Sequence, residues 1–227
     1  MKISKDTLKI LKNYQKINPS LIVKSGNTIK SLSDAKNVYA IAIVEETFPD
    51  FAIYDLNKLL SVVEIMEDPD YDFYDTHLTI SNERQKTKYL YSDPTVLTIK
   101  LPEKEITMVD IQAEFMLRNN DISTINQFAT KLSLPDLVVN IADSTLVGVV
   151  CDKSNPATNS HTITLEQSKY YSDVIGDTDI ELNFKIANLK LLSGDYWIQV
   201  SKKKISKFCN ENMDLTYYIA LESSSIT

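Results

Sequence analysis

The two halves of this chain repeat two short segments in the same order. Residues 19–24 (PSLIVK) resemble residues 135–140 (PDLVVN) at an offset of 116 positions. Residues 51–56 (FAIYDL) resemble residues 184–189 (FKIANL) at an offset of 133, so the second half carries 17 additional residues, expected in the loop at 155–160. Ordered self-similarity of this kind is typical of a duplicated domain, and it restricts the chain to folds built from two like units.

Each half is expected to contain a helix that leads into a strand. The first helix is predicted over residues 5–17, and its counterpart from Asp121 or Ser123 through Leu132. After the second repeated segment, Asp55 and Asn188 occupy predicted N-cap positions, because their side-chain oxygens can accept hydrogen bonds from first-turn amides. Apolar spacing after Asp55 continues as a helix, whereas the helix after Asn188 is expected to be short and to stop at Gly194.

Most of the remaining chain alternates apolar and polar residues, as strands do. The predicted strands are residues 38–44, 77–80, 137–141, 146–150, 161–165, 196–200 and 215–221. We therefore predict an α+β fold in which short helices pack on one side of antiparallel sheets. The expected domains are residues 1–92 and 106–227, joined by a connector at 93–105 that contains two prolines.

Five lysines near the N-terminus are spaced three, four, three and four residues apart, which places them on one face of a helix. They are Lys2, Lys5, Lys9, Lys12 and Lys16. Apolar residues fall on the opposite face and are expected to be buried: Ile3, Leu8, Ile10, Leu11, Tyr14 and Ile17. The protein as a whole is acidic, with a formal net charge of -7 and a pI near 4.9. A positive face on such a protein indicates either a surface for a polyanion such as nucleic acid or a simply solvated face.

Composition argues against several classes of protein. The four glycines are too dispersed for a phosphate-binding loop, so nucleotide hydrolysis is not expected. No nucleophile with a base partner can be assembled, and we expect a protein that is not an enzyme and takes no cofactor. No apolar run approaches the ~20 residues that a membrane helix requires.

Isolated polar residues indicate structure rather than chemistry. Cys151 and Cys209 belong to no metal-type spacing and are expected to be reduced thiols of a cytosolic protein. His77 and His161 are expected to be surface or strand residues rather than ligands. The acidic residues between positions 64 and 75 lack the glycine-centred loop of a calcium motif, so a solvated loop is favoured over a metal site.

An ordered set of segments carries a family resemblance over nearly the whole chain. The segments are residues 1–7, 11–13, 24–26, 52–57, 93–96, 187–190, 194–196 and 220–222. Taken together, they resemble the sliding clamps, or DNA polymerase processivity factors, of large tailed bacteriophages (myoviruses), which are similar to the proliferating cell nuclear antigen type of clamp.

The resemblance implies a DNA clamp fold, in which helices line the hole of a homotrimeric ring and antiparallel sheets form its wall. It implies partners as well: double-stranded DNA bound without regard to sequence, the replicative DNA polymerase, an ATP-dependent clamp loader and late transcription factors. The expected location is the cytoplasm of the infected bacterial host, with no membrane attachment.

The resemblance also assigns roles to residues. The five lysines would face DNA, joined from other helices by Lys58, Arg118, Lys131 and Lys190. The helix ending at Leu132 carries Asn126, Gln127 and Thr130 where more basic residues are expected, so an unevenly charged inner wall is predicted. The lysines at 202–204 are expected to form a solvated hairpin turn, with a DNA-contacting loop as the alternative.

Two further surfaces follow from the resemblance by position. A pocket for partner peptides would involve Tyr39, Leu97, Ile99, Leu101, Tyr218 and Ile219, although ordinary core packing is an equally good interpretation of each. The subunit interface would pair residues 87–91 (Thr87, Lys88, Tyr89, Leu90 and Tyr91) with residues 161–165, including Ile163 and Leu165, of the neighbouring subunit.

Two other functions are compatible with the sequence. The chain could be a virion or complex structural protein, duplicated for assembly, whose lysines are only solvated. It could also be a monomeric duplex-binding protein, which would depend on affinity and show steep salt dependence.

Overall fold

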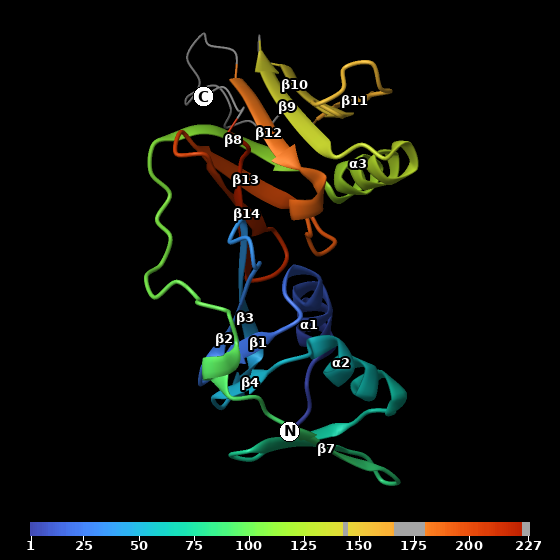
Figure 1. The fold of residues 1–227 in the computed structure, drawn as a ribbon, viewed down its shortest axis with the longest axis vertical. Coiled ribbons are helices and arrows are strands. Elements are labelled where there is room, and N and C mark those ends of the chain that lie inside the picture. Colours follow the sequence, from blue (N-terminus) through green and yellow to red (C-terminus); the bar gives the residue numbers. More distant parts are fainter. Residues whose placement is uncertain (143–144, 166–179, 224–227) are drawn as a thin grey trace. The chain divides into compact units, whose positions relative to one another are not determined.

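The computed structural model describes residues 1–142, 145–165 and 180–223. It divides into two units, Met1–Glu103 and Lys104–Thr227 (Figure 1). Each unit combines short helices with antiparallel strands, which confirms the predicted α+β class. None of the helices in the described part of the chain is long and apolar enough to span a bilayer.

The first helix of unit 1, α1 (Lys5–Ile17), has the predicted bounds. The hydroxyl of Ser4 caps it by accepting a hydrogen bond from the backbone N–H of Thr7, at 3.2 Å. The buried apolar residues of α1 are Ile10, Leu11, Tyr14 and Ile17. All five lysines of the predicted stripe are exposed, which confirms an amphipathic helix. Ile3 and Leu8, also expected to be buried, are only half-buried, and Lys2 and Ile3 precede the helix.

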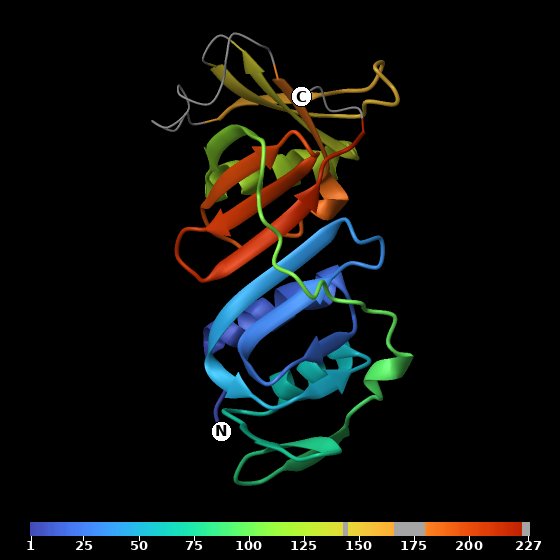
Figure 2. The same ribbon diagram turned by 90° about the vertical axis from the view of Figure 1, so that its left-hand side faces the viewer.

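The strands of unit 1 form three antiparallel groups. They are β1 (Leu21–Val23) paired with β4 (Phe51–Ile53), β2 (Gly26–Leu32) paired with β3 (Val38–Phe48), and β5 (Asp70–Phe73), β6 (His77–Ser81) and β7 (Lys86–Leu90) in that order. Helix α2 (Leu56–Ile65) packs beside α1. Strands β1 to β4 lie on one side of α1 and α2, and the group that contains β7 lies below α2 in the view of Figure 1 (Figures 1 and 2). A short 3-10 turn, η1 (Pro94–Val96), opens the connector.

The described residues of unit 2 form one α-helix and two groups of strands (Figure 2). Strands β11 (His161–Thr164), β10 (Thr145–Cys151), β9 (Asp136–Ala142) and β12 (Ile180–Lys185) lie in that spatial order. Strands β8 (Ile111–Leu117), β13 (Tyr196–Ser201), β14 (Ile205–Asn210) and β15 (Leu215–Ala220) lie in the order β8-β13-β14-β15. Helix α3 (Asn119–Leu132) packs against β10.

Helix α3 begins earlier than its sequence suggests. We predicted an N-cap at Asp121 or Ser123, but the helix starts at Asn119. Its first amide is satisfied from outside the helix, because Asp195 Oδ1 accepts the N–H of Asn119 at 2.8 Å. A carboxylate at a helix N-terminus also interacts favourably with the helix dipole. The sequence prediction was wrong because the capping group comes from a distant segment.

The two units repeat the same strand pairing. Leu21 faces Ile53 across β1 and β4, and Leu137 faces Phe184 across β9 and β12. The strand pairing confirms the offset of 116 for the first repeated segment, which equates Leu21 with Leu137. For the second segment it equates Ile53 with Phe184, so the structural offset is 131 and the predicted 133 is wrong. Because side chains alternate faces with a period of two, a two-residue shift keeps the same residues inward, and the sequence match could not detect it.

The second repeated segment diverges after its strand. Asp55 is an N-cap as predicted, since its Oδ1 accepts from the N–H of Lys58 at 3.1 Å. Asn188 is not an N-cap: it is the last residue of a single 3-10 turn, η2 (Ile186–Asn188), which begins after Lys185. The predicted insertion site holds only part of the additional length, because the loop at 152–160 has nine residues against five for its equivalent at 33–37.

Predictions about individual strands and side chains are also confirmed. The seven predicted strands are all present, and His77 and His161 each begin one of them. Residues 202–204 form the turn between β13 and β14. Cys151 and Cys209 are free thiols.

Candidate nucleic-acid interface and associated surfaces

Four exposed lysines lie on α1 and a fifth, Lys2, precedes the helix. We call this set the lysine face: Lys2, Lys5, Lys9, Lys12 and Lys16. Three of these cations contact carboxylates. Lys2 Nζ lies 2.8 Å from Asp68 Oδ2 and 3.6 Å from Asp70 Oδ2. Lys12 Nζ lies 2.7 Å from Glu64 Oε1, and Lys9 Nζ lies 2.7 Å from Asp6 Oδ1.

The ion pairs divide the lysine face into two groups. Among the described residues, Lys5 and Lys16 have no carboxylate within 4.0 Å. The hydrogen bond to Asp68 is the main reason that the pKa of Lys2 is raised above its ordinary value. The acidic segment that the sequence suggested as a solvated loop thus contacts the lysine face directly, through Asp68 and Asp70.

A buried carboxylate anchors the start of α1. Glu46 lies on the inward face of β3 and is only 9% exposed. It accepts a 2.5 Å hydrogen bond from the hydroxyl of Thr7 and another from the backbone N–H of Ser4. Burial alone would raise the pKa of Glu46, but these hydrogen bonds outweigh burial and hold that pKa below its ordinary value. Glu46 therefore fixes the orientation of the lysine face against the sheet.

Sequence reasoning missed Glu46, although a signal was present. In β3 the inward positions alternate, and Glu46 falls between Val44 and Phe48, both of which are buried. A charged residue in an otherwise apolar inward register needs partners. The sequence could not show that those partners are at the N-terminus of α1.

The other predicted DNA-facing cations are more dispersed. Lys58 lies on α2, 3.7 Å from Asp55, and Lys131 lies in the last turn of α3. Arg118 precedes α3, with Nη1 3.1 Å from Asp195 Oδ2. Lys190 follows η2 and is half-buried.

The exposed side of α3 carries amide and hydroxyl side chains around a shallow hollow of about 490 Å³. The hollow is lined by Asn119, Ile122, Ser123, Asn126, Gln127, Thr130, Lys131, Leu191 and Ser193. Lys131 is the only cation in this lining, so the surface differs sharply in charge from the lysine face.

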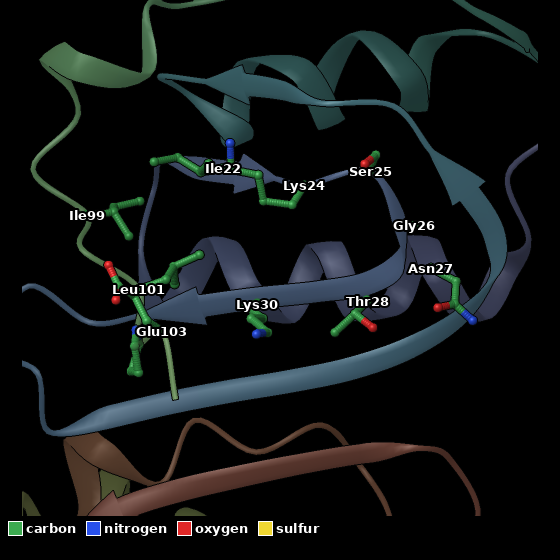
Figure 3. A pocket seen from close by; sticks show the side chains of 11 residues that line it. Ile22, Lys24, Ser25, Gly26, Asn27, Thr28, Lys30, Ile99, Leu101 and Glu103 are labelled. Atoms are coloured by element: carbon green, nitrogen blue, oxygen red, sulfur yellow. The ribbon is translucent and has the colours of Figure 1, made fainter. Parts of the chain in front are cut away.

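A second surface lies in unit 1, where the connector passes β1 and β2 (Figure 3). It encloses a pocket of about 550 Å³. Ile99, Leu101 and Glu103 form one wall, and residues from β1, β2 and the turn between them form the other (Figure 3). Apolar side chains and two cations, Lys24 and Lys30, both contribute to the lining.

The residues predicted for a partner-peptide pocket do not all lie at a surface. Ile99 and Leu101 line the 550 Å³ pocket, whereas Leu97 and Tyr39 are buried in unit 1. In unit 2, Tyr218 is buried and donates to the carbonyl of Ile106 at 3.2 Å. Ile219 is 0% exposed in β15, where it belongs to the core and is out of reach of a peptide.

The residues predicted for the subunit interface lie on edge strands. Strand β7 ends the sheet β5-β6-β7, and β11 ends the described sheet β11-β10-β9-β12. The opposite edges of these sheets are partly covered: Met1 exchanges two hydrogen bonds with Tyr71 of β5, and the N–H of Glu222 donates to Asn183 of β12.

Hydrogen-bond alternation shows which backbone groups of β7 and β11 point outward. The N–H of Tyr91 donates to Thr76 and the N–H of Leu165 donates to Leu146. Because inward and outward groups alternate along an antiparallel strand, Lys88 in β7 and Thr162 in β11 direct their N–H and C=O groups away from their own sheets. Side chains on both strands alternate between half-buried and exposed.

Solved structures of the proliferating cell nuclear antigen (PCNA) type share this fold. PCNA from Thermococcus kodakaraensis gives a TM-score of 0.68 at 11% identity and covers 96% of both chains. A. fulgidus PCNA, solved with the C-terminal region of FEN-1 bound, gives a TM-score of 0.68 at 12% identity and likewise covers 96% of both chains. The chain therefore has the DNA clamp fold of PCNA.

Sequence comparisons find sliding clamps of phages. Residues 114–223 match the family model described as gp45 sliding clamp, C terminal. The sliding clamp of Vibrio phage KVP40 is 29% identical over 98% of this chain and 100% of its own length. That of Enterobacteria phage T4 is 26% identical over 99% of this chain and 98% of its own length. The chain is therefore similar to the phage sliding clamps over nearly its whole length, as its sequence segments indicated.

Proposed function

We propose that the protein is a non-enzymatic sliding clamp that closes as a homotrimeric ring around duplex DNA and tethers the replicative polymerase. The observation that carries this proposal is the exposed lysine face on α1, in a chain whose fold is that of a sliding clamp. The protein is otherwise acidic, with a net charge of -7. Concentrating positive charge on one helix attracts DNA to that helix, while the acidic remainder repels it.

Contacts of this kind suit movement along DNA. Exposed lysines meet phosphates through screened interactions, because the Debye length is about 8 Å at physiological salt. Phosphate contacts carry no sequence information, so binding is independent of sequence. Retention then comes from ring closure rather than from affinity.

Ring closure would use the two uncovered edge strands. Strand β7 of one subunit would pair with β11 of the next, since each directs unpaired backbone groups outward at Lys88 and Thr162. A head-to-tail pairing of two different edges closes into a ring under cyclic symmetry. Two units in each of three subunits would give six around the DNA.

Polymerase tethering would use the 550 Å³ pocket beside the connector. Its apolar residues Ile22, Ile99 and Leu101 suit the anchor side chains of a short peptide, and Lys24 and Lys30 suit acidic residues beside them. A. fulgidus PCNA, which shares the fold, binds the C-terminal region of a partner protein. Loading would require a separate ATP-driven loader, and the same pocket could take late transcription factors in the cytoplasm of the host bacterium.

The mass in solution tests ring closure. The trimer is expected at three times 25.8 kDa, about 77 kDa, by light scattering. Lys88→Pro and Thr162→Pro each remove one outward N–H, so the pairing between subunits is lost and monomers are expected. The fold of each subunit should be kept, because no hydrogen bond within the sheet is lost. Lys88→Ala and Thr162→Ala keep that N–H and should remain trimers. A protein that is monomeric at every concentration would contradict the proposal.

Retention on circular and linear DNA distinguishes a closed ring around the duplex from binding by affinity alone. Clamp loaded on nicked circular DNA should stay bound through gel filtration and should be lost once the circle is linearised. Lys5→Ala with Lys16→Ala should reduce loading and processive synthesis at physiological salt. A monomeric duplex-binding protein would instead bind circles and linear fragments equally, with steep salt dependence.

A further inference from the structure

The lysine face is partly occupied by the protein's own carboxylates. Glu64 is in the last turn of α2, and Asp68 lies between α2 and β5. Glu64 contacts Lys12, in the middle of the lysine face, and Asp68 contacts Lys2, at its start. Lys2 Nζ also donates to the carbonyl of Asp68 at 2.6 Å, so this cation is held by two oxygens of one residue.

Carboxylate and phosphate oxygens interact with a lysine ammonium group in similar ways. Each accepts a charge-assisted hydrogen bond from the ammonium group at about 2.7–2.9 Å. The distances from Lys12 to Glu64 and from Lys2 to Asp68, 2.7 and 2.8 Å, fall in that range. A DNA phosphate that approaches either lysine therefore competes with a carboxylate that already neutralises part of its charge and accepts one of its N–H groups.

Building on the proposed function, we propose that Glu64 and Asp68 act as internal phosphate mimics that limit the affinity of the lysine face for duplex DNA. Lys5 and Lys16 remain available for DNA throughout, and Lys9 is paired with Asp6 of its own helix. Lys2 and Lys12 contribute fully only when Asp68 and Glu64 release them. The pairs are exposed: side-chain exposure is 49% and 83% for Lys2 and Asp68, and 45% and 58% for Lys12 and Glu64. Exposed pairs are weak enough to exchange, so the face holds DNA lightly while it moves.

The direct test neutralises both mimics. Glu64→Gln keeps a good helix former in α2, and Asp68→Asn suits a backbone with φ of 44°, because asparagine tolerates the left-handed region. Binding of the full-length protein to a short linear duplex is measured by fluorescence anisotropy across a NaCl titration. The double variant should bind about 2- to 30-fold more tightly, from the range measured for two exposed ion pairs. Its log–log salt slope should steepen by up to about 1.8, since two lysines would now neutralise phosphates fully.

A matched control separates pairing from net charge. Glu45→Gln with Glu83→Gln changes the net charge by the same amount, but these exposed carboxylates lie on β3 and in the turn before β7, without an ion pair to the lysine face. This control should leave affinity within about 2-fold of the unmodified protein. Equal tightening in both double variants would overturn the proposal, because net charge alone would then explain it.

A second background distinguishes this inference from the DNA-facing role of α1. When Lys2→Ala and Lys12→Ala are combined with the neutralised mimics, the tightening should disappear. Lys5→Ala with Lys16→Ala could weaken DNA binding while Glu64→Gln with Asp68→Asn fails to strengthen it. In that case α1 binds DNA, but the proposed role of Glu64 and Asp68 is wrong. If the lysine substitutions have no effect either, the assignment of α1 as the DNA-binding surface is wrong, and so is the proposed role of Glu64 and Asp68.

Discussion

Replacement of Glu46 by alanine should loosen the lysine face by releasing α1 from the sheet. Glu46 accepts hydrogen bonds from Thr7 and Ser4, and a hydrogen bond to a charged group contributes about 1.5–3 kcal/mol. Removing the carboxylate also removes its own cost of burial, and Thr7 keeps a 3.0 Å hydrogen bond from the hydroxyl of Ser4. These effects offset part of the loss, so we expect about 2–3 kcal/mol of destabilisation in unit 1.

The assay must separate the two units, because the only tryptophan, Trp197, lies in β13 of unit 2. Urea unfolding followed by tryptophan fluorescence should therefore be nearly unchanged, whereas the helical circular dichroism signal should be lost at lower urea. Hydrogen exchange should show faster opening of the α1 amides. Glu45→Ala is the matched control, since its exposed side chain is next in β3 and should change stability by less than about 0.5 kcal/mol.

Equal effects of Glu46→Ala and Glu45→Ala would refute this reasoning. That result would mean that the apolar face of α1, with Tyr14 and Ile17 fully packed, positions the helix without help from the carboxylate. Glu46→Gln should fall between the two, at about 1 kcal/mol, because it keeps one acceptor and loses the charge.

Further outcomes follow from other contacts. Because hydrogen bonds hold the pKa of Glu46 below its ordinary value, its stabilising contribution should be complete above about pH 4.3 and lost as pH falls through the lowered value; Glu46→Gln should flatten that part of a stability profile. Asp195→Ala should cost about 1–2 kcal/mol in urea unfolding of unit 2, since it removes the cap on Asn119. Gly194→Ala should cost about 1–2 kcal/mol, because φ is +153° and the new Cβ would lie 2.5 Å from Asn210 Nδ2. Leu101→Glu should weaken binding of a polymerase-derived peptide at least 10-fold by calorimetry while leaving the mass of the trimer unchanged.

The spacing of apolar and charged residues predicted those helices and strands whose two faces differ strongly in polarity. Helix α1 was predicted to the residue because its lysines and apolar residues separate cleanly at the helical period. Strand β7, by contrast, has the sequence KTKYL at a sheet edge and was expected only through the family resemblance. Edge strands bury little, so their pattern carries a weak signal. The start of α3 was missed because its cap, Asp195, is remote in sequence.

The sequence by itself determined where positive charge lies on α1, the α+β class and the duplication of the unit, because each depends on local spacing or on similarity along the chain. Only the tertiary structure decided which carboxylates meet that charge. Glu46, Glu64 and Asp68 come from different elements, and their distances to α1 depend on how β3 and α2 pack against it. Electrostatic interactions depend on separation in space, so a list of charges along a chain cannot show which of them are paired.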